Sequence, residues 1–371
     1  MTKIEQIGIE SGRRILVTSD IHGHLSYFKN VLDRAVFTDS DILFIVGDIL
    51  EKGPDSLGTL RYVMDIYRRG NVVPLIGNVD AWCIKTIFEL NKENAQDFFD
   101  YICSKRKWYS SNLYEELASE CGYRIESPED ILASKEAVLS RFEQELRFLM
   151  QLPTVIETQN YVFVHGGLHE KTVTGNAERN IFQLTKYDAF MSATQHVFDK
   201  YIIVGHWPVS LYCDTRQQLN PVINREKRII SIDGGCGTKK ERQLNLLIIP
   251  DIQCSVDDIS HISYDDFPVI KALEDQKEME GSVYISWINR EIQVMSRGTE
   301  FSHIRHEQSG KELSVPNAYL VGEHECADIS DYRPEVTKGE SLSVIFETSE
   351  GCIVKKKGVV GWYCGKYERM H

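Results

Sequence analysis

Six polar side chains follow five short apolar runs in the first 210 residues, and all six types are metal ligands in proteins. A single Asp or His after a strand is usually a turn former or a helix cap, so the set matters more than any member. Carboxylate, imidazole and amide oxygen suit Mn, Fe, Zn or Ni better than they suit a thiolate site. The set is Asp20, His22, Asp48, Asn78, His165 and His206.

Six ligands exceed the needs of one tetrahedral ion and suffice for two. One carboxylate must then bridge the ions, and Asp48 is central in the chain order. Two metals about 3.5–4 Å apart clamp the attacking and leaving oxygens of an in-line displacement and lower the pKa of a shared water. The set therefore predicts hydrolysis by a metal-activated hydroxide, without a nucleophilic side chain.

The elements that must position these side chains alternate between strand-like and helix-like patterns. Short apolar runs read as strands covered on both faces, with helical spacing between them. The pattern predicts an α/β catalytic domain over 1–255 with a helical insertion over 81–152, an acidic connector over 256–280 and a small β domain over 281–371. The expected strands of the first domain are 14–18, 42–46, 72–76, 161–164, 201–204, 229–232 and 244–249.

The stretches SDIHGH, GDILEKGPDS, GNVD, FVHGGL, GHWPV and IDGGC, in that order, resemble the calcineurin-like metallophosphoesterases over about 13–250. More narrowly they resemble the phosphoprotein-phosphatase branch, which includes bacterial serine/threonine phosphatases and symmetrical diadenosine tetraphosphatases. The resemblance implies a four-layer α/β/β/α sandwich and two divalent transition-metal ions, Mn²⁺ first, with Fe, Zn or Ni as alternatives. It implies a first metal held by Asp20, His22 and Asp48, and a second held by Asp48, Asn78, His165 and His206.

Two departures from the family pattern concern the leaving group. Val79 stands where the family has a His that protonates the leaving oxygen, and Glu51 and Lys52 stand where it has Asp and Arg. General acid catalysis is typically worth about 10²–10⁴-fold, so we expect a slower phosphatase, a preference for good leaving groups, or a different acid. His24 and His169 are the alternative acids. The catalytic residues expected beside the metals are Asp48, Glu51, Lys52 and His24.

A second phosphate-binding residue is expected between the HGG and GH motifs, but the sequence leaves the choice open. Its candidates are Arg179, Lys186 and Tyr187, for which a solvated helix face is the alternative.

The C-terminal stretch 327–371 weakly resembles an SH3-like barrel. Its aromatic residues predict either a groove for a protein partner or the core and rim of a barrel. They are Tyr332, Trp362, Tyr363 and Tyr367.

Composition limits which binding partners and which cellular compartment we expect. The chain has 371 residues, with 42 Lys and Arg against 55 Asp and Glu, a net charge of −13. That balance is unfavourable for binding nucleic-acid phosphates. No apolar run approaches the roughly 20 residues that cross a membrane, the start lacks a secretion-signal pattern, and nine scattered cysteines without a C-x-x-C pair indicate reduced thiols. We expect a cytoplasmic enzyme without nucleic-acid or membrane partners.

The leading functional hypothesis is hydrolysis of phosphomonoesters, with protein phosphoserine and phosphothreonine as substrates. A dinucleoside polyphosphate hydrolase is the alternative, and the few Arg and Lys near the motifs argue mildly against it. A catalytically weakened, phosphatase-like scaffold is a second alternative. A complete set of metal ligands argues against the scaffold.

Overall fold

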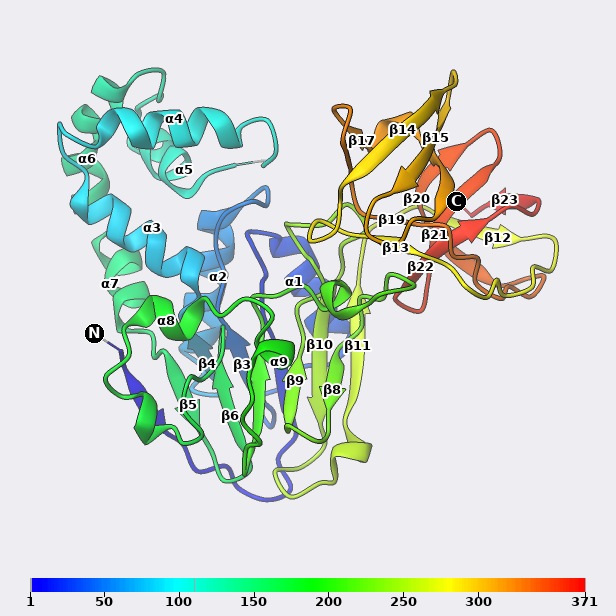
Figure 1. Ribbon diagram of the computed structural model, residues 1–371. Helices are drawn as coiled ribbons and strands as arrows, with labels where there is room; N and C mark the ends of the chain where they lie inside the picture. The colour runs from blue at the N-terminus through cyan, green and yellow to red at the C-terminus, as the bar shows by residue number, and fades with distance from the viewer. Residues whose placement is uncertain (1, 110, 371) are drawn as a thin grey trace. The chain divides into compact units, whose positions relative to one another are not determined.

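A computed structural model describes residues 2–109 and 111–370. The chain divides into two compact units (Figure 1). Unit 1 comprises 1–207, 221–238 and 244–264, and unit 2 comprises 208–220, 239–243 and 265–371. The second unit thus includes two short segments that lie within the range of the first in the sequence.

Unit 1 is built on two sheets. The six-stranded sheet has the order β1 (Ile4–Gln6), β5 (Val155–Glu157), β6 (Tyr161–Val164), β7 (Tyr201–Val204), β9 (Ile229–Ser231) and β8 (Val222–Asn224). The five-stranded sheet has the order β11 (Ser260–Tyr264), β10 (Leu244–Ile249), β2 (Ile15–Thr18), β3 (Ile42–Val46) and β4 (Val72–Leu75).

Alternate residues of the central strands explain why both faces of these sheets are buried. One face of β3 presents Phe44, which stacks on Phe163 of β6 with ring centroids 3.9 Å apart, so the two sheets pack on each other. The opposite face presents Leu43 and Ile45 to a second core that includes apolar residues of α1 (Leu25–Arg34) and α2 (Ser56–Tyr67). Fully buried strands read as continuous apolar runs, as the sequence indicated.

The segment between β4 and β5 is helical, as Figure 1 shows in cyan and blue-green. Its helices begin where side chains cap free backbone N–H groups: Asn112 accepts from Tyr114 N, and Ser127 accepts from Asp130 N. The helices are α3 (Asn78–Glu89), α4 (Ala95–Lys105), α5 (Leu113–Glu120), α6 (Pro128–Arg141) and α7 (Glu143–Gln151). Two short helices, α8 (Ile181–Thr185) and α9 (Phe190–Ala193), follow β6.

Strand direction brings the loops of interest together. Strands β2, β3 and β4 are mutually parallel, and so are β6, β7 and β9. Carboxyl ends of parallel neighbours lie at one edge of a sheet, which is where ligands bind in layered α/β folds. The predicted α/β sandwich with a C-terminal β region is confirmed.

The predicted acidic connector over 256–280 is not devoid of regular structure. It contains β11, which pairs with β10, and β12 (Val269–Ala272), which pairs with β20 (Ser341–Thr348). The many acidic residues of the stretch make a short alternation of apolar residues hard to recognise in the sequence. In this alternation, Ile270 and Ala272 pack in the core of unit 2. These residues form a strand because their backbone pairs with a strand that is distant in the sequence, and a local sequence pattern does not show that pairing.

Unit 2 is antiparallel. Its largest sheet has the order β22 (Val359–Tyr363), β21 (Gly351–Lys356), β20, β12 and β23 (Tyr367–Arg369). A three-stranded sheet is formed by β14 (Ile292–Arg297), β15 (Phe301–His306) and β16 (Glu312–Pro316), and short pairs join β13 (Tyr284–Ile285) to β19 (Ile329–Ser330) and β17 (Leu320–Val321) to β18 (Glu325–Cys326). An SH3-like identity for 327–371 stays a prediction.

The aromatic residues of the C-terminal stretch are structural. Tyr332, Trp362 and Tyr363 are buried. The Trp362 indole donates to Ser330 O at 3.0 Å, and the Tyr363 hydroxyl donates to Glu274 O at 2.8 Å. Tyr367 is partly buried and packs on the core of the large sheet of unit 2. These contacts place the aromatic residues in or beside the core of unit 2, and a role for them in binding a protein partner stays a prediction.

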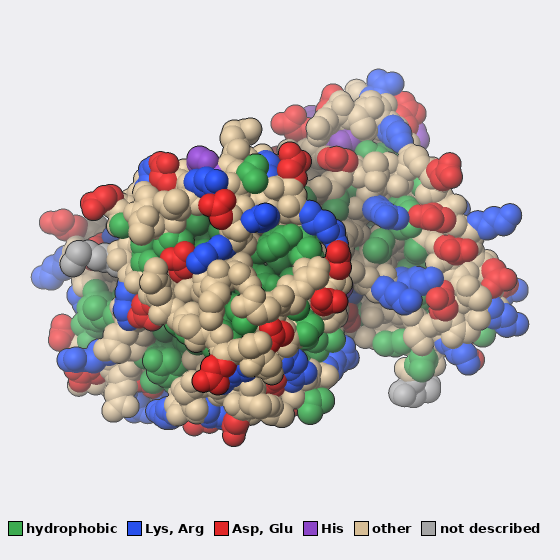
Figure 2. Space-filling model, turned by 90° about the horizontal axis from the view of Figure 1, so that it is seen from below, with side chains coloured by type: hydrophobic (Ala, Val, Ile, Leu, Met, Phe, Trp, Pro, Cys, Tyr) green, Lys and Arg blue, Asp and Glu red, His purple; other side chains and the backbone are tan. Residues whose placement is uncertain are grey.

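The surface mixes both charges. Figure 2 shows Lys and Arg interspersed with Asp and Glu on the face that it presents, without a broad area of one sign. Among the described residues, no helix combines the length and the apolar character that crossing a bilayer requires.

Candidate metal centre

The loops that follow β2 and β3 run side by side in a strained conformation. Asp20 N donates to Gly47 O and His22 N donates to Asp48 O, both at 3.0 Å. Non-glycine residues with positive φ are uncommon, and strain of this kind gathers at functional sites. Six of the predicted site residues have it: Asp20, His22, Asp48, Glu51, Lys52 and His206, with φ between 48° and 72°.

Glycines let these loops approach each other. A Cβ on Gly77 would clash with the backbone N and the Oδ1 of Asp48, and a Cβ on Gly205 would clash with Oδ2 of Asp20. The GN and GH motifs thus need glycine because a neighbouring strand end occupies the space of a side chain.

A compact acidic and imidazole cluster results. Ligand atoms of Asp20, Asp48 and His165 lie within 4.8 Å of one another, and all three side chains are buried. His165 Nε2 lies 3.3 Å from Asp48 Oδ1 and 4.0 Å from Asp20 Oδ1. His165 Nδ1 donates to Val46 O at 2.7 Å, which leaves Nε2 facing the carboxylates. This is a buried Asp/His metal site.

The other three predicted ligands border the same cluster. His22 Nε2 lies 3.8 Å from Asp20 Oδ1 and 3.6 Å from Asp48 Oδ2, while its Nδ1 donates to Leu50 O at 3.0 Å. The Asn78 amide lies 3.2 Å from His165 Nε2 and 2.8 Å from His206 Nδ1. The structure therefore brings all six sequence-predicted ligands together.

Burial and mutual charge perturb the titration of the cluster. Burial raises the pKa of Asp20 to about 6. The pKa of His165 rises to about 10 although burial opposes it, because the carboxylates of Asp48 and Asp20 face the ring. Against the same burial, His165 and His22 hold the pKa of Asp48 well below its usual value.

The two outer imidazoles shift in the opposite direction. Burial, with Lys52 nearby, lowers the pKa of His22 to about 3. Burial, with the charge of His165, lowers the pKa of His206 to about 4. Neutral imidazoles beside ionised carboxylates are the protonation states in which both groups bind metal ions.

Lys52 lies beside this cluster: its Nζ is 2.8 Å from His22 Nε2. It thus reaches the predicted metal ligands from the loop after β3. A lysine there can contact a phosphate oxygen as a point charge.

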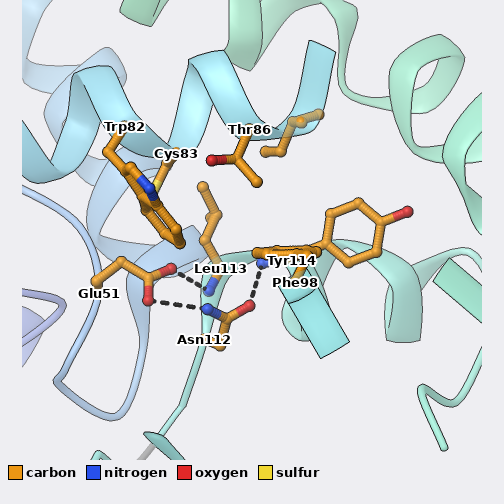
Figure 3. A pocket seen from close by; sticks show the side chains of 9 residues that line it. Glu51, Trp82, Cys83, Thr86, Phe98, Asn112, Leu113 and Tyr114 are labelled. Carbon is orange, nitrogen blue, oxygen red and sulfur yellow. Dashed lines mark hydrogen bonds between the residues drawn. The ribbon is translucent and has the colours of Figure 1, made fainter. Parts of the chain in front are cut away.

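Glu51 points elsewhere. Its carboxylate accepts from Leu113 N at 2.7 Å and from Asn112 Nδ2 at 2.9 Å, within a pocket lined by Trp82 and Cys83 (Figure 3). Burial raises the pKa of Glu51 to about 7. The sequence predicted a catalytic role for Glu51 beside the metals, but its carboxylate bonds to the first backbone N–H of α5, 62 residues later.

The predicted replacement acids also contact the backbone. His24 Nδ1 donates to His22 O at 2.9 Å, and His169 Nε2 donates to Gln183 O at 2.9 Å. The His169 ring stacks on Tyr187 at 4.6 Å, and Arg179 pairs with Glu170 at 3.3 Å. Lys186 is exposed and forms no ion pair with the cluster within residues 2–109 and 111–370.

Two residues of the site were missed by sequence reasoning. Asp80 is buried and accepts from Ile49 N, Leu50 N and Gly77 N, so it ties the loop after β3 to the start of α3. The sequence feature that could have indicated Asp80 is its place as the last residue of GNVD, the third position of α3. Asp188 Oδ1 lies 2.7 Å from His206 Nε2 and orients that ring, and no local pattern marks it.

Comparisons with known proteins agree with this geometry. The model of the calcineurin-like phosphoesterase family matches residues 13–231. A symmetrical bis(5'-nucleosyl)-tetraphosphatase of Buchnera aphidicola subsp. Schizaphis graminum is 25% identical over 150 residues, which are 40% of this chain and 54% of that protein. The chain thus spans about half the length of this relative.

Two further similarities are more limited in extent or in identity. A symmetrical bis(5'-nucleosyl)-tetraphosphatase of Cellvibrio japonicus is 37% identical over 79 residues, 21% of this chain and 28% of that protein. The structure of a protein serine/threonine phosphatase from Saccharomyces cerevisiae superposes with a TM-score of 0.43 at 12% identity, covering 71% of this chain and 84% of that one.

Proposed function

The chain belongs to the calcineurin-like phosphoesterase family, and we propose that it is a dinuclear metal hydrolase whose preferred substrates are phosphoanhydrides of the dinucleoside polyphosphate class. The observation that carries the hydrolytic function is the buried convergence of Asp20, Asp48 and His165 within 4.8 Å. Converging buried carboxylate and imidazole groups are a donor set that fits divalent metal ions.

The ligand roles follow from which atoms face each other. Asp48 presents Oδ2 to His22 and Oδ1 to His165, so this one carboxylate faces both imidazoles. We assign Asp20, His22 and Asp48 to a first ion and Asp48, Asn78, His165 and His206 to a second, with Mn²⁺ as the leading candidate. When bound, the ions supply Lewis-acid activation of water and of the phosphoryl oxygens.

Outside the ions, Lys52 is the residue placed to neutralise phosphate. Its ammonium reaches His22 from a loop that glycines and strained backbone hold in place. Asp188 and the backbone carbonyls of Val46 and Leu50 fix the tautomers of the imidazoles, so each ring presents its other nitrogen to the cluster.

The leaving group decides between the substrate classes. Val79 cannot donate a proton, and one ring nitrogen each of His24 and His169 donates to a backbone carbonyl. An alkoxide from phosphoserine is strongly basic and needs protonation, whereas a phosphate leaving group has a second pKa of about 6. The site therefore suits anhydrides and aryl esters better than alkyl esters.

The relatives support the same order. The curated proteins that the chain resembles are symmetrical bis(5'-nucleosyl)-tetraphosphatases, and they favour the polyphosphate alternative over the phosphoprotein hypothesis. Hydrolysis of phosphoserine and phosphothreonine in proteins remains the second candidate, supported by the motif order alone.

A substrate panel tests the proposal. The purified chain with Mn²⁺ should hydrolyse diadenosine tetraphosphate and p-nitrophenyl phosphate faster than a phosphoserine peptide, and Asp48→Asn should abolish all three rates. Equal rates for the parent and Asp48→Asn would contradict the enzyme and favour the scaffold. A phosphoserine peptide as the best substrate would reverse the proposed order.

A further inference from the structure

The segment between α4 and α5 carries an exposed tryptophan within a run of cations. The run reads Lys105, Arg106, Lys107, Trp108 and Tyr109. Trp108 is 79% exposed, the largest exposure among the large hydrophobic side chains of residues 2–109 and 111–370. An indole has a flat, amphipathic surface that is typical of recognition sites.

Residues 111–113, on the C-terminal side of this run, bond to the loop that follows β3. Ser111 Oγ donates to the carbonyl oxygen of Gly53, the residue directly after Lys52, at 2.9 Å. Asn112 and Leu113 both bond to the Glu51 carboxylate. Because a chain spans at most about 3.3–3.6 Å per residue, the Cα of Trp108 lies within about 11 Å of the Cα of Ser111.

Tyr109 supports the same placement. Burial raises the pKa of Tyr109, and the charge of Glu51 adds to the shift. Bonds from residues 111–113 to Glu51 and Gly53, with the influence of Glu51 on Tyr109, thus place the end of the segment that carries Trp108 near the loop that follows β3.

The cations of the run differ in how they are engaged. Arg106 pairs with Glu115 at 2.6 Å and donates to Ile125 O, so it serves the fold of the insertion. Lys105 lies over the ring of Tyr109, 5.2 Å from its centroid. Lys107 is exposed and pairs with no carboxylate in the part of the chain that the structure describes. Its charge is available to a ligand.

We propose that Trp108 and Lys107 form a nucleoside-binding element of the active site, in which the indole stacks on a nucleobase and the ammonium pairs with an outer phosphate. The proposal rests on the proposed function and names the part of the substrate that this segment recognises. Base–aromatic stacking is worth about 1–3 kcal/mol per base and does not depend on base identity. A phosphoserine peptide offers no base to this surface.

The sequence indicated that few cations lie near the motifs, but the fold brings cations from a distant part of the chain toward them. The lysines of this run follow motif GDILEK by more than fifty residues in the sequence, yet Ser111 bonds to the residue after Lys52. A polyphosphate substrate could thus meet Lys52 at the metal centre and Lys107 farther along the chain of phosphates.

The test compares two substrates that differ in their nucleosides. The kcat/KM values for diadenosine tetraphosphate and p-nitrophenyl phosphate are measured with Mn²⁺, and their ratio is taken. Trp108→Ala should lower the ratio by about 5- to 150-fold, the range that corresponds to one stacked base, mainly through KM. Trp108→Phe should restore most of it, and Lys107→Ala should lower it in a salt-dependent manner.

Trp287→Ala, which removes a tryptophan 41% exposed in unit 2, is the matched control and should leave the ratio unchanged. An unchanged ratio in Trp108→Ala, or an equal loss for both substrates, would overturn the nucleoside-binding element while leaving the hydrolase intact. If the parent hydrolyses neither substrate, the proposed function fails, and the nucleoside-binding element fails with it.

Quenching of Trp108 fluorescence gives a second readout without turnover. In the Asp48→Asn variant, ADP should quench emission in a chain that retains Trp108, and Trp108→Ala in the same background should remove the quenching. Quenching that persists without Trp108 would contradict the stacking.

Discussion

At the scale of single residues, Val79 is the position that most constrains the chemistry. Its backbone N donates to Asp48 Oδ1 at 2.9 Å, so the residue lies at the metal centre even though its side chain cannot carry a proton. The neighbouring motif positions carry carboxylate, imidazole and amide side chains. A buried Asp/His metal site thus lies beside a residue that cannot protonate the leaving oxygen.

We predict that Val79→His increases the hydrolysis of phosphoserine peptide relative to p-nitrophenyl phosphate. An imidazole can protonate the alkoxide, whereas an aryl oxide needs less help, and general acids contribute up to about 10²–10⁴-fold. Rates for both substrates, measured from pH 5 to 9, check the effect. Val79→Gln, which is polar but does not titrate, is the control, and a similar rise in both variants would refute the acid role.

At the scale of elements, the metal centre forms where the loops after neighbouring strands approach each other closely. The start of α3 lies against the loop after β3 because Gly77 has no side chain and Asp80 bonds to both. The ligands therefore depend on backbone approach as much as on their own identity.

Replacing Gly77 by Ala should weaken metal binding by at least tenfold, because the added Cβ clashes with the backbone and carboxylate of Asp48. Gly8→Ala is the matched control, since nothing lies within 4 Å of its Cβ position. Mn²⁺ affinity by calorimetry and the thermal midpoint report site and fold separately. Equal metal affinity in the two variants would show that the strand ends tolerate separation.

The same elements show what the sequence can and cannot reveal. The continuous apolar runs 42–46 and 201–204 predicted β3 and β7 to the residue, because fully buried strands leave a strong local pattern. The three-residue strands β1 and β8 escaped notice, since pairing with a neighbour rather than composition defines them.

The side chains of the proposed metal site followed from motifs, whereas the contacts of Glu51 did not. Its partners Asn112 and Leu113 arrive from the helical insertion, and Asp188 reaches His206 from a loop without a signature. Tertiary approach decides such partners, so one sequence carries no local trace of them.

At the scale of the whole molecule, unit 2 has polar groups in its own core. Glu241 is buried, and Gln217 Nε2 donates to its Oε2 at 3.2 Å. Burial, with Asp328 nearby, raises the pKa of Glu241 from 4.5 to about 7. Lys239 pairs with Asp328 at 2.5 Å and partly offsets that charge.

This burial predicts a pH-dependent stability. Between about pH 4.5 and 7 the folded carboxyl keeps a proton that the unfolded chain releases, so the free energy of unfolding of unit 2 falls as pH rises through that window. Glu241→Gln should remove this fall and exceed the parent in stability at pH 8, while matching it near pH 4. Urea unfolding of the full chain across this range checks it, and parallel pH profiles would refute it.

The most direct test of the central claim is the number of metal ions that the chain binds. Equilibrium dialysis against Mn²⁺ with elemental analysis, together with electron paramagnetic resonance, should give two spin-coupled ions per chain. The same measurement on Asp48→Asn should lose the coupling, because that carboxylate faces both His22 and His165. One uncoupled ion per chain, or none, would contradict the account.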